Sequence, residues 1–137
     1  MALAQTGRLK ESIQELNEAI SLNPKYLEAR INLGLVLSQN NDLAGAANVY
    51  REILKQNPGM PEVHNNLGLV LLQGKDPSAE AAFKEALRLK PDYAEAHYNL
   101  GLALHQAGKK EEARSEMERA YQLAPRLKKA ATEAQRH

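Results

Sequence analysis

The chain has 137 residues and a formal net charge of +1, and 43% of its residues are hydrophobic while 4% are aromatic. Its near-neutral charge gives no reason to expect a nucleic acid or a membrane as partner, because both attract strongly basic surfaces. The absence of cysteine excludes disulfides and thiolate metal sites. The sequence shows neither an apolar run of about 18 residues nor a signal peptide, which leaves the localisation open, with the cytoplasm as the default expectation.

One sequence pattern occurs three times along the chain. Residues 28–37, 62–71 and 95–104 each contain Asn-Leu-Gly-Leu. Four prolines recur at intervals of 34, 33 and 34 residues: Pro24, Pro58, Pro91 and Pro125. A period in this range indicates an array of helical repeats, in which each unit packs against its neighbours rather than around a common centre.

The N-terminal part is predicted to form one helix over residues 8–22. Its apolar residues recur at spacings of three and four, which is typical of an amphipathic helix: Leu9, Ile13, Leu16, Ala19 and Ile20. Residues 2–8 match residues 103–109, where the first helix of a later repeat ends. We therefore expect the chain to open on the last turn of a helix whose body is missing. The apolar stripe left uncovered would favour weak self-association through this N-terminal helix.

Three helix pairs follow. The first is predicted at residues 27–39 and 43–55, with Asp42 as the N-cap of its second helix. In the second pair, one helix starts near Pro61 and ends near residue 72. A turn at residues 74–77 precedes its partner, with Asp76 as cap and one residue lost from the turn.

The third pair is predicted at residues 94–106 and 110–123, and the segment after Pro125 is mostly polar with Leu127 as its one large apolar residue. Such a segment is suited to close a repeat array against water. The sequence thus divides one domain into a partial repeat at 1–24 that supplies a second helix, full repeats at 25–58, 59–91 and 92–125, and a C-terminal capping helix at 126–137.

The units resemble tetratricopeptide repeats. The first pair carries Leu33-Gly34, then Ala46 and Tyr50, and a closing proline at Pro58. The later units carry the equivalents Leu67-Gly68, Ala79 and Phe83, and Leu100-Gly101, Ala113 and Met117. We expect glycine to lie opposite alanine so that the backbones approach closely, which would offset a cost of about 1 kcal/mol for glycine inside a helix. The resemblance implies an all-α, right-handed superhelical solenoid of antiparallel helix pairs.

Two positions depart from the family pattern. The first large residue of the pattern is replaced by Arg30, His64 and His97, and the aromatic after Leu-Gly is replaced by leucine. We interpret the two histidines, which lie one repeat apart, as packed replacements rather than metal ligands.

The resemblance also implies a concave groove, lined by the first helix of each pair, that binds a protein or a peptide. A helix turns about 100° per residue, so residues off the packed face of these helices are the groove candidates. They are Glu28, Ile31, Asn32, Leu35, Gln39, Glu62, Asn65, Asn66, Leu69, Gln73, Glu95, Tyr98, Asn99, Leu102 and Gln106.

Asparagine recurs at the same position of each repeat, as Asn32, Asn66 and Asn99. An amide both donates and accepts hydrogen bonds, so a row of them suits the backbone of an extended peptide. The row resembles the asparagine ladder in the repeat arm of O-linked N-acetylglucosamine transferases, which implies peptide binding. The alternative is that each asparagine bonds a neighbouring helix and orders the array.

Glutamate also recurs, as Glu28, Glu62 and Glu95 at the edge of the predicted groove, and leucine recurs on its floor. No Lys or Arg recurs on this face, so we expect no clamp for a terminal carboxylate. The combination favours a partner with apolar anchors and basic flanks. The alternative for the glutamates is a favourable charge in the first turn of each helix.

No residues in the sequence suggest catalysis. No serine has partnered His and Asp residues, no glycine-rich phosphate loop occurs, and no His or carboxylate spacing suits a metal, so we expect neither enzyme activity nor a metal or cofactor. The C-terminal Lys and Arg residues are interpreted as solvated charges, because no aromatic residue lies between them.

The sequence therefore predicts a non-catalytic protein–protein interaction module that binds a peptide or partner segment in its groove. Two alternatives fit the same residues. The array could be the substrate-recruiting arm of a larger enzyme such as a glycosyltransferase, or a self-assembling structural scaffold.

Overall fold

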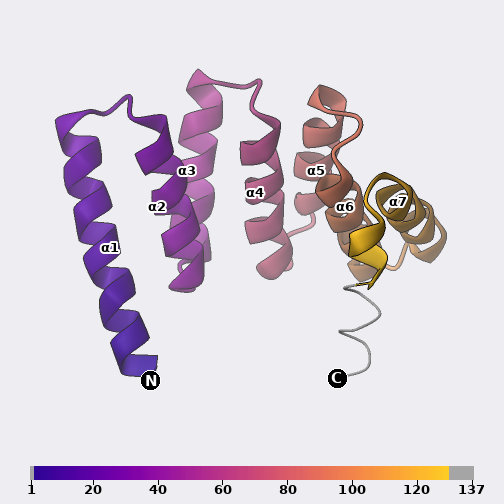
Figure 1. Ribbon diagram of the computed structural model, residues 1–137, viewed down its shortest axis with the longest axis horizontal. Helices are drawn as coiled ribbons and strands as arrows, with labels where there is room; N and C mark the ends of the chain where they lie inside the picture. Colours follow the sequence, from indigo (N-terminus) through magenta and orange to yellow (C-terminus); the bar gives the residue numbers. More distant parts are fainter. Residues whose placement is uncertain (1, 130–137) are drawn as a thin grey trace.

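The computed structural model describes residues 2–129, with side chains from residue 7 onward, and it shows helices and no strand in this part of the chain (Figure 1). The helices are α1 (Ala2–Leu22), α2 (Leu27–Gln39), α3 (Leu43–Gln56), α4 (Pro61–Gln73), α5 (Ala79–Leu89), α6 (Ala94–Gln106) and α7 (Lys110–Leu123). Residues 125–129 are also helical. Within the described part, no helix is long and apolar enough to cross a membrane.

The helices follow one another along an arc (Figure 1). The most extensive contacts lie within the pairs α2–α3, α4–α5 and α6–α7, as the predicted repeat units require. The first helices also touch one another, α2 with α4 and α4 with α6, whereas comparable contacts between α3 and α5 or between α5 and α7 are not found in residues 2–129. First helices that lie closer together than second helices form the inner side of the arc. The predicted all-α solenoid of helix pairs is confirmed.

The predicted bounds of α2, α3, α4, α6 and α7 agree with the structure to within one residue. The predicted cap Asp42 accepts a hydrogen bond from the Gly45 N–H at 2.9 Å. In the second pair, α5 begins at Ala79 and its N-cap is Ser78, so the prediction of Asp76 as the cap is wrong. Asp76 holds this turn by accepting hydrogen bonds from the backbone N–H and the hydroxyl of Ser78, which also lower the pKa of Asp76.

The turns inside the three pairs share one backbone geometry. The residue at the same place in each has positive φ: Asn41 at 62°, Lys75 at 57° and Gly108 at 83°. In the first of them the Asp42 N–H donates to the Leu37 carbonyl at 2.8 Å, and the other two turns repeat this bond. This is the Schellman ending of a helix, in which a left-handed residue lets the last N–H groups reach back to free carbonyls.

The structure differs from the prediction at the N-terminus. The expected turn near Gly7 is absent, because α1 runs without interruption from Ala2 to Leu22. The matching Gly108 does turn the chain, at φ 83°, although a Cβ at either glycine would have no neighbouring atom within 4 Å. Glycine permits the turn at this position but does not impose it, because a single glycine is also tolerated inside a helix.

The apolar stripe of α1 is partly covered. Leu9, Ile13, Leu16, Ala19 and Ile20 are half-buried, because α1 packs along α2. At the end of the helix, Leu22 is 88% exposed. Self-association through this helix stays a prediction. Of the predicted capping helix, residues 126–129 are helical and residues 130–137 lie outside the described part of the chain.

The repeated glycine of each first helix has a large side chain of the second helix as its nearest neighbour, and the expected contact with alanine is found at Gly101, where a Cβ would lie 3.2 Å from the Ala113 backbone oxygen. A Cβ at Gly34 would be 2.5 Å from the Tyr50 ring, and one at Gly68 would be 2.5 Å from the Phe83 ring. At Gly101 the nearest atom is Met117 Cγ, at 2.6 Å. The alanines are buried beside these contacts. Glycine is therefore needed because a large side chain of the partner helix fills the space that a Cβ would occupy.

We predict that Gly68→Ala lowers the free energy of unfolding by about 1–3 kcal/mol, because the added methyl overpacks against the fully buried Phe83 ring. Gly101→Ala is the comparison variant and should cost less, since Met117 is flexible and only the Ala113 backbone oxygen, 3.2 Å from the added methyl, resists it. Urea unfolding of both variants checks this. A Gly68→Ala protein as stable as the wild type would contradict the contact.

Tyr50 gives a second prediction. Its hydroxyl is buried and has no hydrogen-bond partner among the described residues, and burial raises its pKa from 10.0 to about 12. Removing this hydroxyl in Tyr50→Phe should stabilise the protein at neutral pH by about 1 kcal/mol. As the pH rises above 10, the Tyr50 hydroxyl ionises in the unfolded chain before it ionises in the folded protein. The free energy of unfolding of the wild type should therefore fall by about 2–3 kcal/mol between pH 10 and pH 12, and that of the variant should not show this fall. Urea midpoints of both proteins across this pH range measure the difference, and parallel curves would refute it.

Candidate peptide-binding groove

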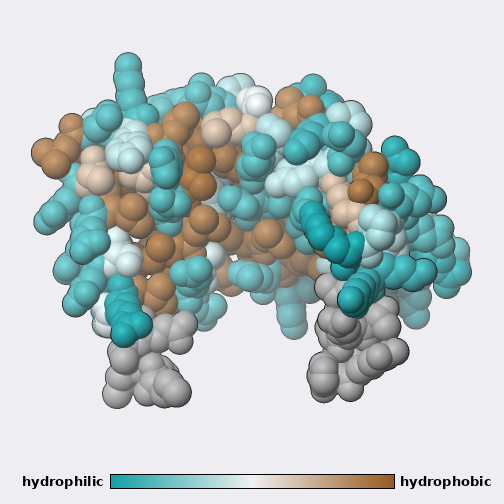
Figure 2. All heavy atoms as spheres, viewed as in Figure 1, coloured by the Kyte–Doolittle hydropathy of each residue, from teal (hydrophilic) through white to brown (hydrophobic). Residues whose placement is uncertain are grey.

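The inner side of the arc is formed by α2, α4 and α6, and we call it the groove face. Thirteen of the fifteen predicted groove residues are exposed or half-buried, and Asn65 and Asn99 are buried. Leu35 is the large apolar residue of this face that protrudes most, with 39% of its surface exposed. Figure 2 shows apolar residues gathered in the left and central part of its view, over α2 and α4, with hydrophilic residues around them.

Each first helix carries a regular row of the predicted groove residues. On α2, Glu28, Ile31 and Leu35 lie three and four residues apart, so they occupy one face of the helix. The corresponding rows are Glu62, Asn65 and Leu69 on α4, and Glu95, Tyr98 and Leu102 on α6. Each row begins with a carboxylate in the first turn and continues to a leucine on the floor. The groove face is therefore acidic at one edge and apolar along its middle.

The repeated asparagines have different environments. Asn99 is 9% exposed, and its Nδ2 donates to Oδ1 of Asn65 at 3.1 Å. Asn65 is 5% exposed and donates in turn to the hydroxyl of Tyr93 at 3.4 Å. This network joins α4 to α6. Asn99 therefore follows the alternative prediction, in which an asparagine bonds a neighbouring helix and orders the array. Asn32 is exposed and Asn66 half-buried, and neither side chain has a hydrogen-bond partner within residues 2–129.

Tyr93, which the sequence did not single out, is the N-cap residue of α6 and lies where the second and third repeats meet. Burial and the neighbouring carboxylates of Glu62 and Glu95 raise the pKa of its hydroxyl, against a smaller opposing effect of the Asn65 hydrogen bond. The equivalent N-cap residues of α2 and α4 are Tyr26 and Met60. This recurrence of a large side chain at the start of each first helix is the sequence signal that could have identified the position.

The glutamates at the groove edge differ in their partners. Glu95 forms an ion pair with Arg126, which lies in the helical stretch that follows α7. Glu28 and Glu62 are exposed and pair with no cation in the described part of the chain. Tyr98 packs against Tyr121 of α7 with ring centroids 6.3 Å apart, so part of this groove residue stabilises the third pair.

The two histidines bind the backbone at the junctions between repeats. The Nε2 of His64 lies 2.9 Å from the Pro58 carbonyl, and that of His97 lies 2.8 Å from the Pro91 carbonyl. The Nδ1 of His97 also contacts Glu116 at 2.8 Å. Each histidine therefore ties a first helix to the proline that closes the preceding repeat. Within residues 2–129, no three His, Asp or Glu side chains are grouped to hold a metal ion.

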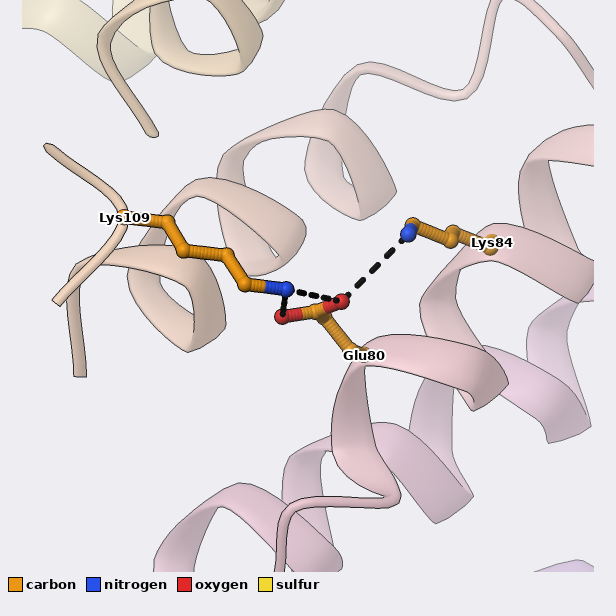
Figure 3. Close-up of polar contacts among 3 residues, drawn as sticks. All are labelled: Glu80, Lys84 and Lys109. Carbon is orange, nitrogen blue, oxygen red and sulfur yellow. Dashed lines mark hydrogen bonds and ion pairs between the residues drawn. The ribbon is translucent and has the colours of Figure 1, made fainter. Parts of the chain in front are cut away.

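An ion network joins the outer ends of the second and third repeats. Glu80 of α5 lies between Lys109 and Lys84, with Nζ to carboxylate distances of 3.3 Å to each lysine (Figure 3). Partial burial disfavours the Glu80 carboxylate, but hydrogen bonds from Lys109 and Lys84 outweigh it and lower its pKa. The network borders a surface hollow of about 520 Å³ between α5 and the end of α6. Sequence spacing could not reveal this contact, because Lys109 is 29 residues from Glu80.

Helix pairs stacked in this way define a helical-repeat solenoid. A family model described as TPR repeat matches residues 2–41 and 71–108, and two described as tetratricopeptide repeat match residues 94–127 and 31–81. The chain belongs to the tetratricopeptide repeat family. Comparison with curated protein sequences found no match.

Several solved structures of MamA are similar to the chain. The "MamA RS-1 ArsTM double mutant" is 27% identical with a TM-score of 0.79, over 87% of this chain and 67% of that one. "MamA MSR-1 C2" is 26% identical with a TM-score of 0.75, over 92% and 73%. "MamA 41-end from Desulfovibrio magneticus RS-1" is 20% identical with a TM-score of 0.78, over 89% and 70%, and shows the fold alone. Family and neighbours make this chain a protein–protein interaction or scaffold module.

The amide network gives a testable prediction. Asn99→Ala and Asn65→Ala should each lower the free energy of unfolding by about 1–2 kcal/mol, because each leaves a buried polar partner unsatisfied. The double variant should lose less than the sum, by about 1 kcal/mol, since the two residues share one bond. Asn32→Ala, at the equivalent exposed position, should change stability by less than about 0.5 kcal/mol. Additive losses in a urea double-mutant cycle would refute the network.

Proposed function

We propose that the groove face binds an extended peptide or an unfolded segment of a partner protein, without catalysing a reaction. The observation that carries this proposal is the row of leucines on the groove floor. Leu35 is 39% exposed, and its equivalents in the next two repeats, Leu69 and Leu102, are half-buried. An apolar row in a concave surface supplies affinity, because a partner's side chains remove it from water.

Unpartnered amides beside this row would supply the polar contacts. Asn32 and Asn66 are accessible and can each donate to and accept from a peptide backbone. Asn99 is already bonded to Asn65, so we assign it to the junction between repeats and not to the ligand. In this proposal Asn32 and Asn66 contact the peptide, and Asn99 bonds the neighbouring helix.

The groove in this proposal is rigid before binding. The pairs are held by contacts between a glycine and a large side chain, and the second and third repeats are joined by the Asn99–Asn65–Tyr93 network. A preformed groove loses little conformational entropy on binding, so most of the cost of ordering falls on the peptide.

A screen against a peptide library from the host proteome tests the proposal, with Asn32→Ala/Asn66→Ala and Leu35→Ala as groove variants. Asn48→Ala, an exposed asparagine on α3, is the matched control. We expect hits that weaken in both groove variants and are unchanged in the control, while circular dichroism shows that all variants stay folded. An absence of hits, or hits indifferent to both groove variants, would overturn the proposal.

A further inference from the structure

The groove face carries a charge pattern with the same period as its leucines. Glu28, Glu62 and Glu95 are each the second residue of a first helix, and each starts the row that leads to a floor leucine. One carboxylate per repeat therefore flanks one apolar contact per repeat. A partner that matches this face must present cationic and apolar side chains together, at the spacing of the repeats.

One carboxylate of this series, that of Glu95, already has a guanidinium partner within the chain. Arg126 pairs with Glu95, and the next residue, Leu127, is half-buried. A cation followed by a leucine thus occupies the third carboxylate, while the equivalent Glu28 and Glu62 are exposed and have no cationic partner in residues 2–129. The Glu95 contact shows which chemistry the two open positions can accept.

The usual packing distance between neighbouring helices suggests a conformation for the matching peptide. Helices that pack side by side lie about 8–10 Å apart, and α2, α4 and α6 touch in sequence. A polyproline II segment has three residues per turn and rises about 3.1 Å per residue, so side chains three apart point the same way at about 9 Å. A β-strand repeats its side-chain direction at about 7 Å, which does not match.

We propose that the groove face recognises a polyproline-II-like protein segment carrying Arg or Lys at every third residue, with these cations on Glu28 and Glu62 and apolar residues on the leucine floor. Arg126 is then an internal competitor that occupies Glu95 in the free protein. This inference rests on the proposed groove function and adds the chemistry of the ligand. Because the carboxylates are exposed, each contact contributes about a two- to fivefold change in affinity and weakens with salt.

The test uses the full chain and fluorescence anisotropy with three labelled peptides. The first repeats Arg-Pro-Leu, the second repeats Gln-Pro-Leu, and the third has the composition of the first with its arginines adjacent. We expect the first to bind tightest and to lose affinity at high salt. Glu28→Gln and Glu62→Gln should each weaken it about two- to fivefold. Arg126→Gln should strengthen it, and Glu111→Gln on α7, away from the groove, should change nothing.

The outcomes separate this inference from the proposal it rests on. Equal binding of the first and second peptides, or no effect of the Glu28 and Glu62 substitutions, would overturn the charge pattern. If that binding still weakened in Leu35→Ala, the groove function would stand. Equal binding of the first and third peptides would overturn the three-residue spacing. No binding of any of the three would overturn the inference, and the library screen would then decide the groove function alone.

Discussion

The contact between a glycine of each first helix and a large side chain of the second sets the distance within every pair. At Gly34 and Gly68 the space of a side chain is filled by the rings of Tyr50 and Phe83, which are fully buried. The close approach lets two helices of modest apolar content exclude water from their interface. In the third pair Met117 takes this place with a softer side chain. The position of the groove face depends on these contacts, because they fix each first helix against its second.

The junctions between repeats are less uniform than the pairs. The second and third repeats share the Asn99–Asn65–Tyr93 network and the Glu80–Lys109 ion pair. Between the first and second repeats the residue equivalent to Asn65 is Ile31, which packs against the core and offers no hydrogen bond to Asn66. In an array where each unit contacts only its neighbours, such differences make one junction more specific than the other. Glu28 and the exposed Leu35 lie on α2, in the repeat whose junction has fewer polar contacts, whereas Glu62 lies near Tyr93 at the other junction.

A partner would meet two kinds of contact on the groove face. The leucine row contributes through burial of apolar surface, which scales with area and tolerates many side chains. The amides and carboxylates contribute less energy, because they exchange bonds to water for bonds to the ligand, but they fix its register and direction. The ion pair between Arg126 and Glu95 connects this surface to the C-terminal segment. A cationic group of a ligand would therefore compete with Arg126 for the Glu95 carboxylate.

Much of this protein could be predicted from sequence because the determinants are local and repeat. The period of 33 or 34 residues, the prolines and the helical spacing of apolar residues identify the helix pairs, and five helices have the expected bounds. The recurring Glu, Asn and Leu also indicated which helix face to propose as the groove. These features depend on residues within one helix or one turn, where sequence distance and spatial distance agree.

Other properties depended on residues far apart in the chain. Asn32 and Asn99 are equivalent in sequence, yet one is exposed and the other buried, because only Asn99 faces an amide on the neighbouring helix. Gly7 and Gly108 have matching surroundings in sequence, yet one continues a helix and the other turns the chain. The sequence alone determined the repeat, its helices and the face that could bind. Only the tertiary structure decided which repeated residues stay open to a partner, because that depends on what the adjacent repeat places against each of them.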